Sequence, residues 1–161
     1  MTLPDERFET IYARHYPPLV RFLRGMLATR SDAAPDLAHD AFVRLHAASV
    51  AEAETRFWLF RVARNLALNE LKRRSVRDRL AAWIPFATPR TPHDIVENDE
   101  RRRLLSAQIA KLPEHQRAAL LLREWEELSY DEIASALQTT VAKVRTDLFR
   151  ARQTLRERWR E

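Results

Sequence analysis

The chain has 161 residues, 45% of them apolar and 32% charged, which indicates one folded domain or two small ones and excludes a disordered chain. Lysine and arginine outnumber aspartate and glutamate by 28 to 23, and the formal net charge of +5 is compatible with a polyanionic partner. The sequence has no cysteine, which excludes disulfides and thiolate metal sites, and one glycine, which argues against glycine-rich phosphate loops and tight hairpins. No apolar run reaches membrane-spanning length and the start has no signal pattern, so we predict a soluble, cytoplasmic protein. The single glycine favours long helices joined by short turns, so the predicted fold class is all-α.

Three helical stretches are predicted in the first part of the chain. The first covers residues 4–28, and the Pro17-Pro18 pair is expected to kink or divide it because proline removes a backbone donor. The second runs from residue 31 to about residue 48. Its inward positions are Leu37, Ala41, Phe42 and Leu45. The third begins near Thr55 with a core side of Leu59, Val62, Ala63, Leu66 and Ala67.

A proline-rich segment is predicted to join two helical domains. The helical pattern breaks at about residue 77, and three prolines follow between residues 85 and 92. The segment contains three large apolar residues, Trp83, Ile84 and Phe86, which a solvent-exposed flexible linker would not need. We therefore expect these side chains to dock on another surface. Helical periodicity resumes near Asn98. The predicted organisation is an N-terminal domain at 1–76, a linker at 77–98 and a C-terminal domain at 99–161.

The last part of the chain has the pattern of a helix-turn-helix. Ser129 followed by Glu132 is a capping-box signature, and a second helix with an apolar stripe from Val141 to Trp159 follows the turn at 138–140. In this motif the second helix lies in the major groove of DNA. Arginine and lysine can contact guanine or phosphate. Threonine and phenylalanine can contact the methyl group of thymine. The candidate duplex contacts are Thr140, which is also a good N-cap, Lys143, Arg145, Thr146, Phe149 and Arg150.

The outer face of the third helix mixes aromatic, amide and basic side chains. This mixture is typical of surfaces that bind single-stranded nucleic acid. The candidate strand contacts are Trp58, Arg61, Asn65, Asn69, Lys72 and Arg73. For both basic helices a simpler interpretation stays open: a solvated charged face on a helical hairpin, or a core tryptophan with arginines that complement the helix dipole.

No catalytic set is found. The five histidines lack metal-ligand spacing and no nucleophile is paired with a base, so we predict no enzyme activity, metal, cofactor or small-molecule substrate. An acidic and apolar face around Asp36, Asp40, Phe42 and Leu45 is suited to a protein partner with a basic helix, although most such faces are only solvated.

Taken together, these stretches resemble the extracytoplasmic-function sigma factors of bacterial RNA polymerase over nearly the whole chain. The stretch "DLAHDAFVRLHAA" (36–48) resembles the polymerase-binding helix, and "FWLFRVARNLALNELKRR" (57–74) resembles the helix that melts and reads the proximal promoter element. The stretch from Leu112 to Trp159 resembles the C-terminal helix-turn-helix domain, which reads the distal element as duplex.

The resemblance implies a promoter-specificity subunit whose partners are core RNA polymerase, promoter DNA and an anti-sigma protein, often one anchored in a membrane. It also implies that core polymerase is bound through Asp36, Asp40, Phe42 and Arg44, and that the polymerase performs the chemistry. Two alternatives are kept: a sigma-like decoy that binds an anti-sigma protein without DNA, and a dimeric repressor, which leaves residues 1–80 unexplained.

Four residues depart from the family's usual pattern. Gln138 replaces a turn glycine, Ala142 replaces another common glycine, and Phe149 replaces a polar residue. Asp147 stands where a basic residue is frequent; it is expected either to repel phosphates or to accept a hydrogen bond from a cytosine amine. These departures affect the expected promoter sequence and the strength of duplex binding.

Overall fold

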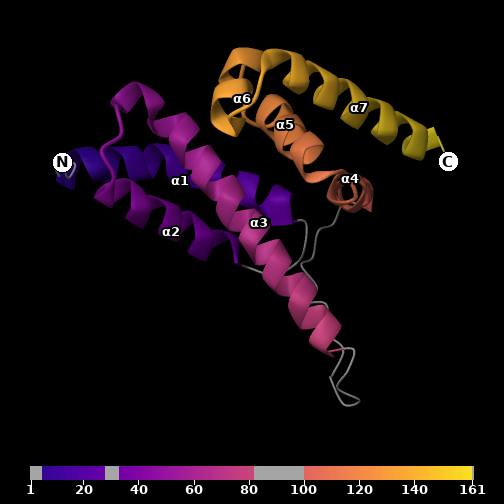
Figure 1. The fold of residues 1–161 in the computed structure, drawn as a ribbon, viewed down its shortest axis with the longest axis horizontal. Coiled ribbons are helices and arrows are strands. Elements are labelled where there is room, and N and C mark those ends of the chain that lie inside the picture. Colours follow the sequence, from indigo (N-terminus) through magenta and orange to yellow (C-terminus); the bar gives the residue numbers. More distant parts are fainter. Residues whose placement is uncertain (1–4, 28–32, 82–99, 161) are drawn as a thin grey trace.

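The structure, a computed structural model, describes residues 5–27, 33–81 and 100–160, and these residues form helices without a strand. Figure 1 shows helices α1, α2 and α3 on one side and the helices of the C-terminal half on the other. The elements are α1 (Asp5–Leu27), α2 (Ala34–Ala47), a 3-10 turn (Glu52–Glu54), α3 (Thr55–Ala81), α4 (Glu100–Ala110), α5 (Glu114–Glu124), α6 (Tyr130–Leu137) and α7 (Val141–Arg160). The all-α prediction is confirmed.

Helix α1 is not divided by its two prolines. It continues through Pro17 and Pro18, although each removes a backbone donor. Buried side chains flank the pair, with Ile11 before it and Leu19, Phe22 and Leu23 after it. Packing on both sides of the prolines therefore holds the helix together where local propensity would end it.

Helix α3 extends past the predicted start of the linker. It ends at Ala81 instead of near residue 76, and Glu70 pairs with Arg74 and Arg77 along its outer turns. No proline lies between Thr55 and Pro85, so no helix-breaking proline stops the helix earlier. The expected docking of Trp83, Ile84 and Phe86 lies outside the described residues.

Helices α1, α2 and α3 form a bundle closed by an aromatic cluster between α1 and α2. The ring of Phe42 lies 4.7 Å from that of Tyr12 and 6.3 Å from that of Phe8 between centroids. Phe42 is only 1% exposed, so the prediction that it binds a partner is wrong for this conformation. The helical periodicity had placed the same residue inward.

Helices α6 and α7 form the predicted helix-turn-helix. Ser129 Oγ accepts from the backbone N–H of Glu132, and Glu132 Oε1 accepts from the N–H of Ser129, which completes the capping box. Gln138 then adopts a left-handed conformation with φ of 53°, and the N–H of Thr139 donates to Ala134 O as in a Schellman turn. The joint thus has the shape for which glycine is usually selected, with a glutamine in its place.

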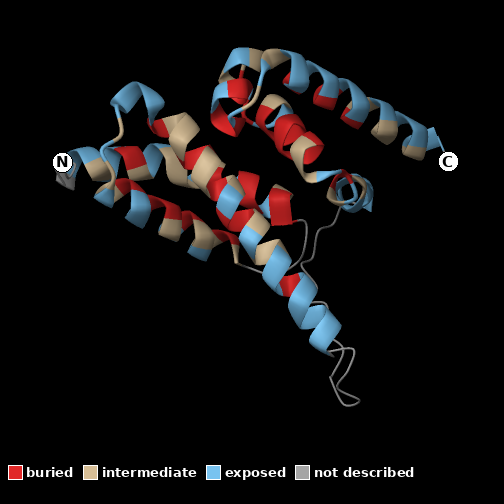
Figure 2. Cartoon of the chain, viewed as in Figure 1, coloured by how far each residue is buried: buried red, intermediate tan, exposed pale blue. Residues whose placement is uncertain are grey.

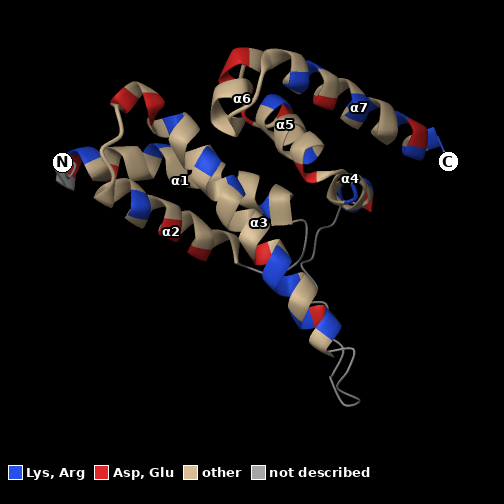
Figure 3. Ribbon diagram, in the orientation of Figure 1, with Lys and Arg blue, Asp and Glu red and all other residues tan. Residues whose placement is uncertain are grey.

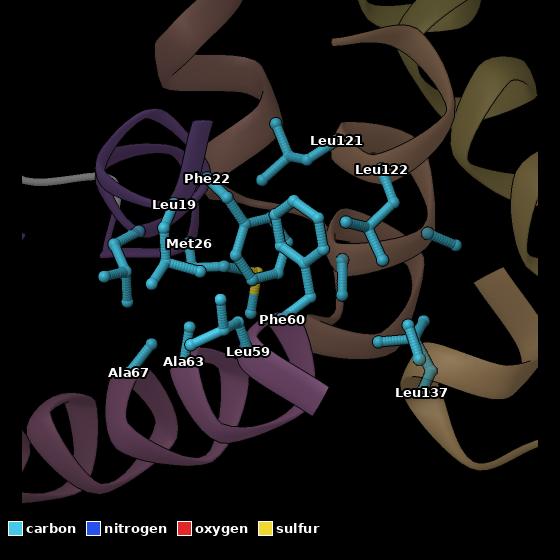
Figure 4. Packing of buried hydrophobic residues seen from close by; sticks show 14 of the residues in the cluster. Leu19, Phe22, Met26, Leu59, Phe60, Ala63, Ala67, Leu121, Leu122 and Leu137 are labelled. Carbon is cyan, nitrogen blue, oxygen red and sulfur yellow. The ribbon is translucent and has the colours of Figure 1, made fainter. Parts of the chain in front are cut away.

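The two halves pack against each other through a continuous core. Figure 4 shows Leu19, Phe22 and Met26 of α1 and Leu59 and Phe60 of α3 facing Leu121, Leu122 and Leu137 of the C-terminal half. The chain's one glycine, Gly25, lies at this contact, where a Cβ atom would come within 2.7 Å of Leu121 Cδ1 and 2.9 Å of Trp125 Cζ3. Glycine therefore allows the close approach of α1 and α5 there, and an added Cβ would displace the ends of these two side chains.

Figure 2 shows buried residues on the inner sides of the helices within each half and where the halves meet, whereas the C-terminal part of α3 is largely exposed. None of the described helices combines the length and apolarity needed to cross a membrane.

Candidate nucleic-acid interfaces

The first candidate interface is the outer face of α7. Val144, Leu148 and Ala151 are buried and fix the helix on α5 and α6. This orientation leaves Lys143, Arg145, Thr146, Phe149 and Arg150 exposed on the other side, and Phe149 is 66% exposed. Figure 3 shows basic residues spaced along this helix. The five residues share one accessible face, as expected for a helix that reads duplex DNA.

Thr140 has a structural role at the start of this helix. Its Oγ1 accepts from the backbone N–H of Lys143 at 3.1 Å, which is the N-cap bond expected from sequence. The same side chain is exposed at the end of the helix that leads into the face. Trp159, predicted as the last residue of the apolar stripe, is instead 49% exposed.

Asp147 does not belong to the exposed face. Its side chain is 4% exposed and accepts from Lys143 Nζ at 2.9 and 3.1 Å, with His115 Nε2 of α5 at 3.7 Å. The expectation that Asp147 repels phosphates or contacts a cytosine amine is therefore wrong for this conformation, because a buried carboxylate presents no surface to DNA.

The second candidate interface is the outer face of α3. Asn65, Asn69, Lys72 and Arg73 are exposed, and Trp58 is partly buried against the core while retaining accessible surface. Both interpretations of Trp58, core residue and surface residue, are thus partly right. Figure 3 shows the concentration of basic residues toward the C-terminal end of α3.

Arg61, on the edge of this α3 face, is bound to the C-terminal half. Its Nη2 donates to Ser135 O at 2.6 Å, and its Nε lies 3.4 Å from Ala136 O. These are carbonyls of the last turn of α6, where the helix dipole favours a cation. One turn further along α3, Arg64 forms a bidentate pair with Glu114 at the start of α5, with one N–O distance of 2.8 Å. The inter-half contact thus uses a residue predicted to bind the opened strand.

Three more arginines connect the halves. Arg21 Nε donates to Glu126 Oε1 at 2.9 Å, and Arg56 Nη2 donates to the backbone oxygen of the same residue at 2.9 Å. The Glu126 side chain is 3% exposed. From the other side, Arg117 donates to Met26 O at 2.8 Å, and burial lowers the pKa of Arg117. Sequence reasoning missed this set, because nothing local distinguishes these arginines from solvated ones.

A third surface is the outer face of α2. Asp36 and Arg44 are exposed, and Arg44 pairs with Asp40 at 3.6 Å one turn away. Val43, which the sequence interpretation omitted, is 53% exposed between these charges. Its position one residue after Phe42 on an amphipathic helix is the signal that could have identified it. Among the described residues no cluster of histidine and acidic side chains could hold a metal ion.

Two family models match the chain. The model "Sigma-70 region 2" matches residues 11–77, which span most of α1 and extend into α3. The model "Sigma-70, region 4" matches residues 102–155, which span most of α4 to α7. The two candidate DNA faces therefore fall in two different matched regions.

Named relatives agree with these matches. The chain is 33% identical over 151 residues to the RNA polymerase sigma-H factor of Pseudomonas aeruginosa, covering 85% of this chain and 76% of the relative. It is 30% identical over 135 residues to the ECF RNA polymerase sigma-E factor of Escherichia coli K12, covering 75% and 71%. It is also similar to the RNA polymerase sigma factor YlaC of Bacillus subtilis, at 28% identity over 160 residues, 94% of this chain and 91% of the relative.

A solved structure has the same fold. It is the sigma factor RpoE of Bartonella quintana in its complex with the anti-sigma factor NepR, with a TM-score of 0.75 over 94% of this chain and 96% of that one. At 20% sequence identity this likeness concerns the fold alone.

Proposed function

The chain belongs to the extracytoplasmic-function family of RNA polymerase sigma factors, and on that basis we propose which of its surfaces bind the polymerase and the promoter. It is a factor that directs transcription initiation; its family consists of transcription regulators and not of enzymes. We assign no chemical step to its side chains, because the polymerase forms the phosphodiester bonds.

The distal promoter element is bound as duplex by α7. The supporting observation is one exposed face with Arg145 and Arg150, which can follow phosphates or guanine edges, beside Thr146 and Phe149, which can contact thymine methyl groups. Lys143 lies at the N-terminal end of the same face, where recognition helices usually contact bases.

The proximal element is bound as an opened strand by α3. Trp58 offers a ring for stacking, Asn65 and Asn69 offer amides for base edges, and Lys72 and Arg73 offer charge to the backbone. Arg61 completes this face only after it leaves the carbonyls of α6, so strand capture requires the inter-half contact to open there.

Core polymerase is bound through the outer face of α2. Asp36, Asp40 and Arg44 supply charge, and Val43 replaces the buried Phe42 as the apolar contact. An anti-sigma protein is a further proposed partner, by analogy with the complex formed by the structural relative.

The single observation that carries this proposal is the presence of two exposed faces of different chemistry, one in each matched region. Transcription with purified core polymerase on fragments of the source genome, with and without the protein, tests it. Discrete new start sites preceded by a shared two-part sequence are expected. Stable core binding without new transcripts would contradict promoter reading, and no core binding would favour the decoy.

Paired variants separate the decoy further. Lys72→Ala and Arg61→Ala are expected to abolish promoter opening while core binding persists, whereas a decoy would be unaffected. Arg7→Ala serves as the matched control, because Arg7 is an exposed cation that pairs with Glu52 and belongs to neither proposed DNA face.

A further inference from the structure

Asp147 is a buried acid on the helix that is proposed to read duplex DNA. Burying a carboxylate is costly unless it is paired. The side chain of Asp147, 4% exposed, is paired on both oxygens with the ammonium group of Lys143 one turn earlier. His115, the second residue of α5, lies 3.7 Å from one of the same oxygens. The carboxylate therefore lies beneath Lys143, between α7 and α5.

Lys143 is held at both ends by these contacts. Its backbone N–H donates to Thr140 Oγ1, and its ammonium group donates to Asp147. The side chain is nevertheless 48% exposed. An ammonium group has three donors, so the two bonds to Asp147 leave one donor for a ligand.

The other cations of the face are not held in this way. Within the described part of the chain, the guanidinium groups of Arg145 and Arg150 make no hydrogen bond or ion pair. Such long, flexible side chains can pair with any nearby phosphate, and this contact strengthens binding without distinguishing one base sequence from another. Lys143 alone on this face combines a fixed position, a neutralised charge and a free donor.

We propose that Asp147 is a positioning residue for sequence reading, which holds Lys143 so that its remaining donor meets an acceptor on one guanine edge in the major groove. Guanine presents two such acceptors there, N7 and O6. Asp147 also cancels the charge that would otherwise draw Lys143 to a phosphate. This inference rests on the proposed duplex binding by α7.

The test uses the full chain bound to core polymerase and a pool of duplex DNA with randomised bases in the distal element. The variants are Asp147→Asn, Lys143→Gln and the double variant, with Asp131→Asn as a control that removes an exposed acid from α6. Wild-type protein is expected to select guanine at one position. Asp147→Asn is expected to lower that preference about tenfold and to raise the salt dependence of binding by about one released ion, because the freed lysine binds phosphate.

The double variant distinguishes positioning from a purely structural role. If Asp147 acts through Lys143, the double variant has the base preference of Lys143→Gln alone, without a further loss. Losses that add, or a guanine preference retained in Asp147→Asn, would overturn the inference while leaving the proposed function intact. A wild-type chain that selects no sequence would overturn both.

Folding is controlled separately. Thermal unfolding of each variant is measured, since Asp147 is buried and Lys143 is half-exposed. If Asp147→Asn unfolds, the Lys143→Gln variant still tests the inference. Lys143→Gln is expected to lose the guanine preference, and a retained preference would overturn the inference.

Discussion

The two candidate DNA faces differ in how far the rest of the chain leaves them accessible. On α7 the five side chains point away from the packed halves, and the bonds of Lys143 to Asp147 and of Thr146 to Ala142 O stay within the helix. On α3 the face is bordered by the C-terminal half, which binds Arg61 and Arg64 through α6 and α5. The face proposed to read duplex is thus open in this conformation, and the face proposed to bind the opened strand is partly engaged in contacts within the chain.

This difference bears in different ways on the two proposed targets. A duplex can meet a preformed helix face without any change in the protein. A single strand needs stacking and backbone contacts on α3. One cation of the α3 face, Arg61, is bound to carbonyls of α6 and is not available for these contacts. We therefore expect duplex binding to be insensitive to the inter-half contact and strand binding to be limited by it.

Salt gives the largest expected effect and acts on both faces together. With ~6 phosphate contacts, the affinity of the polymerase complex for its promoter falls roughly 10³-fold as salt rises from about 50 to about 200 mM. Filter or fluorescence binding over this range measures the slope. A complex indifferent to salt would contradict phosphate binding by either face.

Weakening the inter-half contact is expected to affect the α3 face alone. Glu114→Gln and Glu126→Gln remove the charges that hold Arg64 and Arg21. Charge-assisted hydrogen bonds contribute about 1.5–3 kcal/mol each, so the affinity of the free chain for single-stranded proximal-element DNA should rise about tenfold or more. Its affinity for distal duplex should stay constant.

Glu124→Gln is the matched control for these variants, because Glu124 pairs with Arg152 inside the C-terminal half. Equal strand affinity in all three variants and the wild type would show that the contact does not limit α3.

Loss of either N-cap should lower the stability of the α7 region without touching α3. Ser129→Ala removes the cap of α6 and Thr140→Ala removes that of α7. Each is expected to cost about 1 kcal/mol in the free energy of unfolding, measured by denaturant titration. Similar losses are expected, because the reciprocal bond to Glu132 comes from the backbone N–H of residue 129, which alanine keeps. No change in either variant would mean that the caps are redundant with packing.

Substitution of Gln138 is expected to raise the stability of the fold instead of lowering it. Its φ of 53° is strained for a residue with a side chain, so Gln138→Gly should raise stability by up to about 1 kcal/mol. Chemical denaturation at neutral pH checks this, and a destabilised variant would show that the glutamine side chain contributes more than the strain costs.

The smallest expected effect is the loss of the stability contributed by the Glu132 carboxylate at low pH. The backbone N–H of Ser129 donates to Glu132 and holds the pKa of that carboxyl below its ordinary value. The folded pKa is lower than the unfolded one, so this contribution is complete above about pH 4.3 and is lost as the pH falls through the folded pKa. Unfolding midpoints of the wild type and Glu132→Gln should differ at neutral pH and converge in acid; a constant difference would contradict the assignment.

Sequence predicted the features that depend on local chemistry. The Ser129 box, the Thr140 cap and the exposed face of α7 follow from spacing and residue type alone. Periodicity placed Phe42 inward correctly, whereas the resemblance to the family placed it in a docking surface; in this structure the periodic pattern was the better guide.

Features that depend on contacts distant in sequence were not predictable. Asp147 is buried because His115 and the start of α5 lie against it, and no pattern in α7 reveals this neighbour. The arginines between the halves likewise resemble solvated charges until both halves are folded. Gly25 was visible as a single glycine, but its role at the crossing with Leu121 was not.

The difference in accessibility between the two faces is tested most directly by the distance between α3 and α7. The chain has no cysteine, so spin labels can be introduced at Val76→Cys and Gln153→Cys, both at exposed positions. One narrow distance distribution is expected in the free chain, with a longer distance when core polymerase and promoter DNA are bound. The same distance in both states would contradict the claim that strand binding requires the halves to separate.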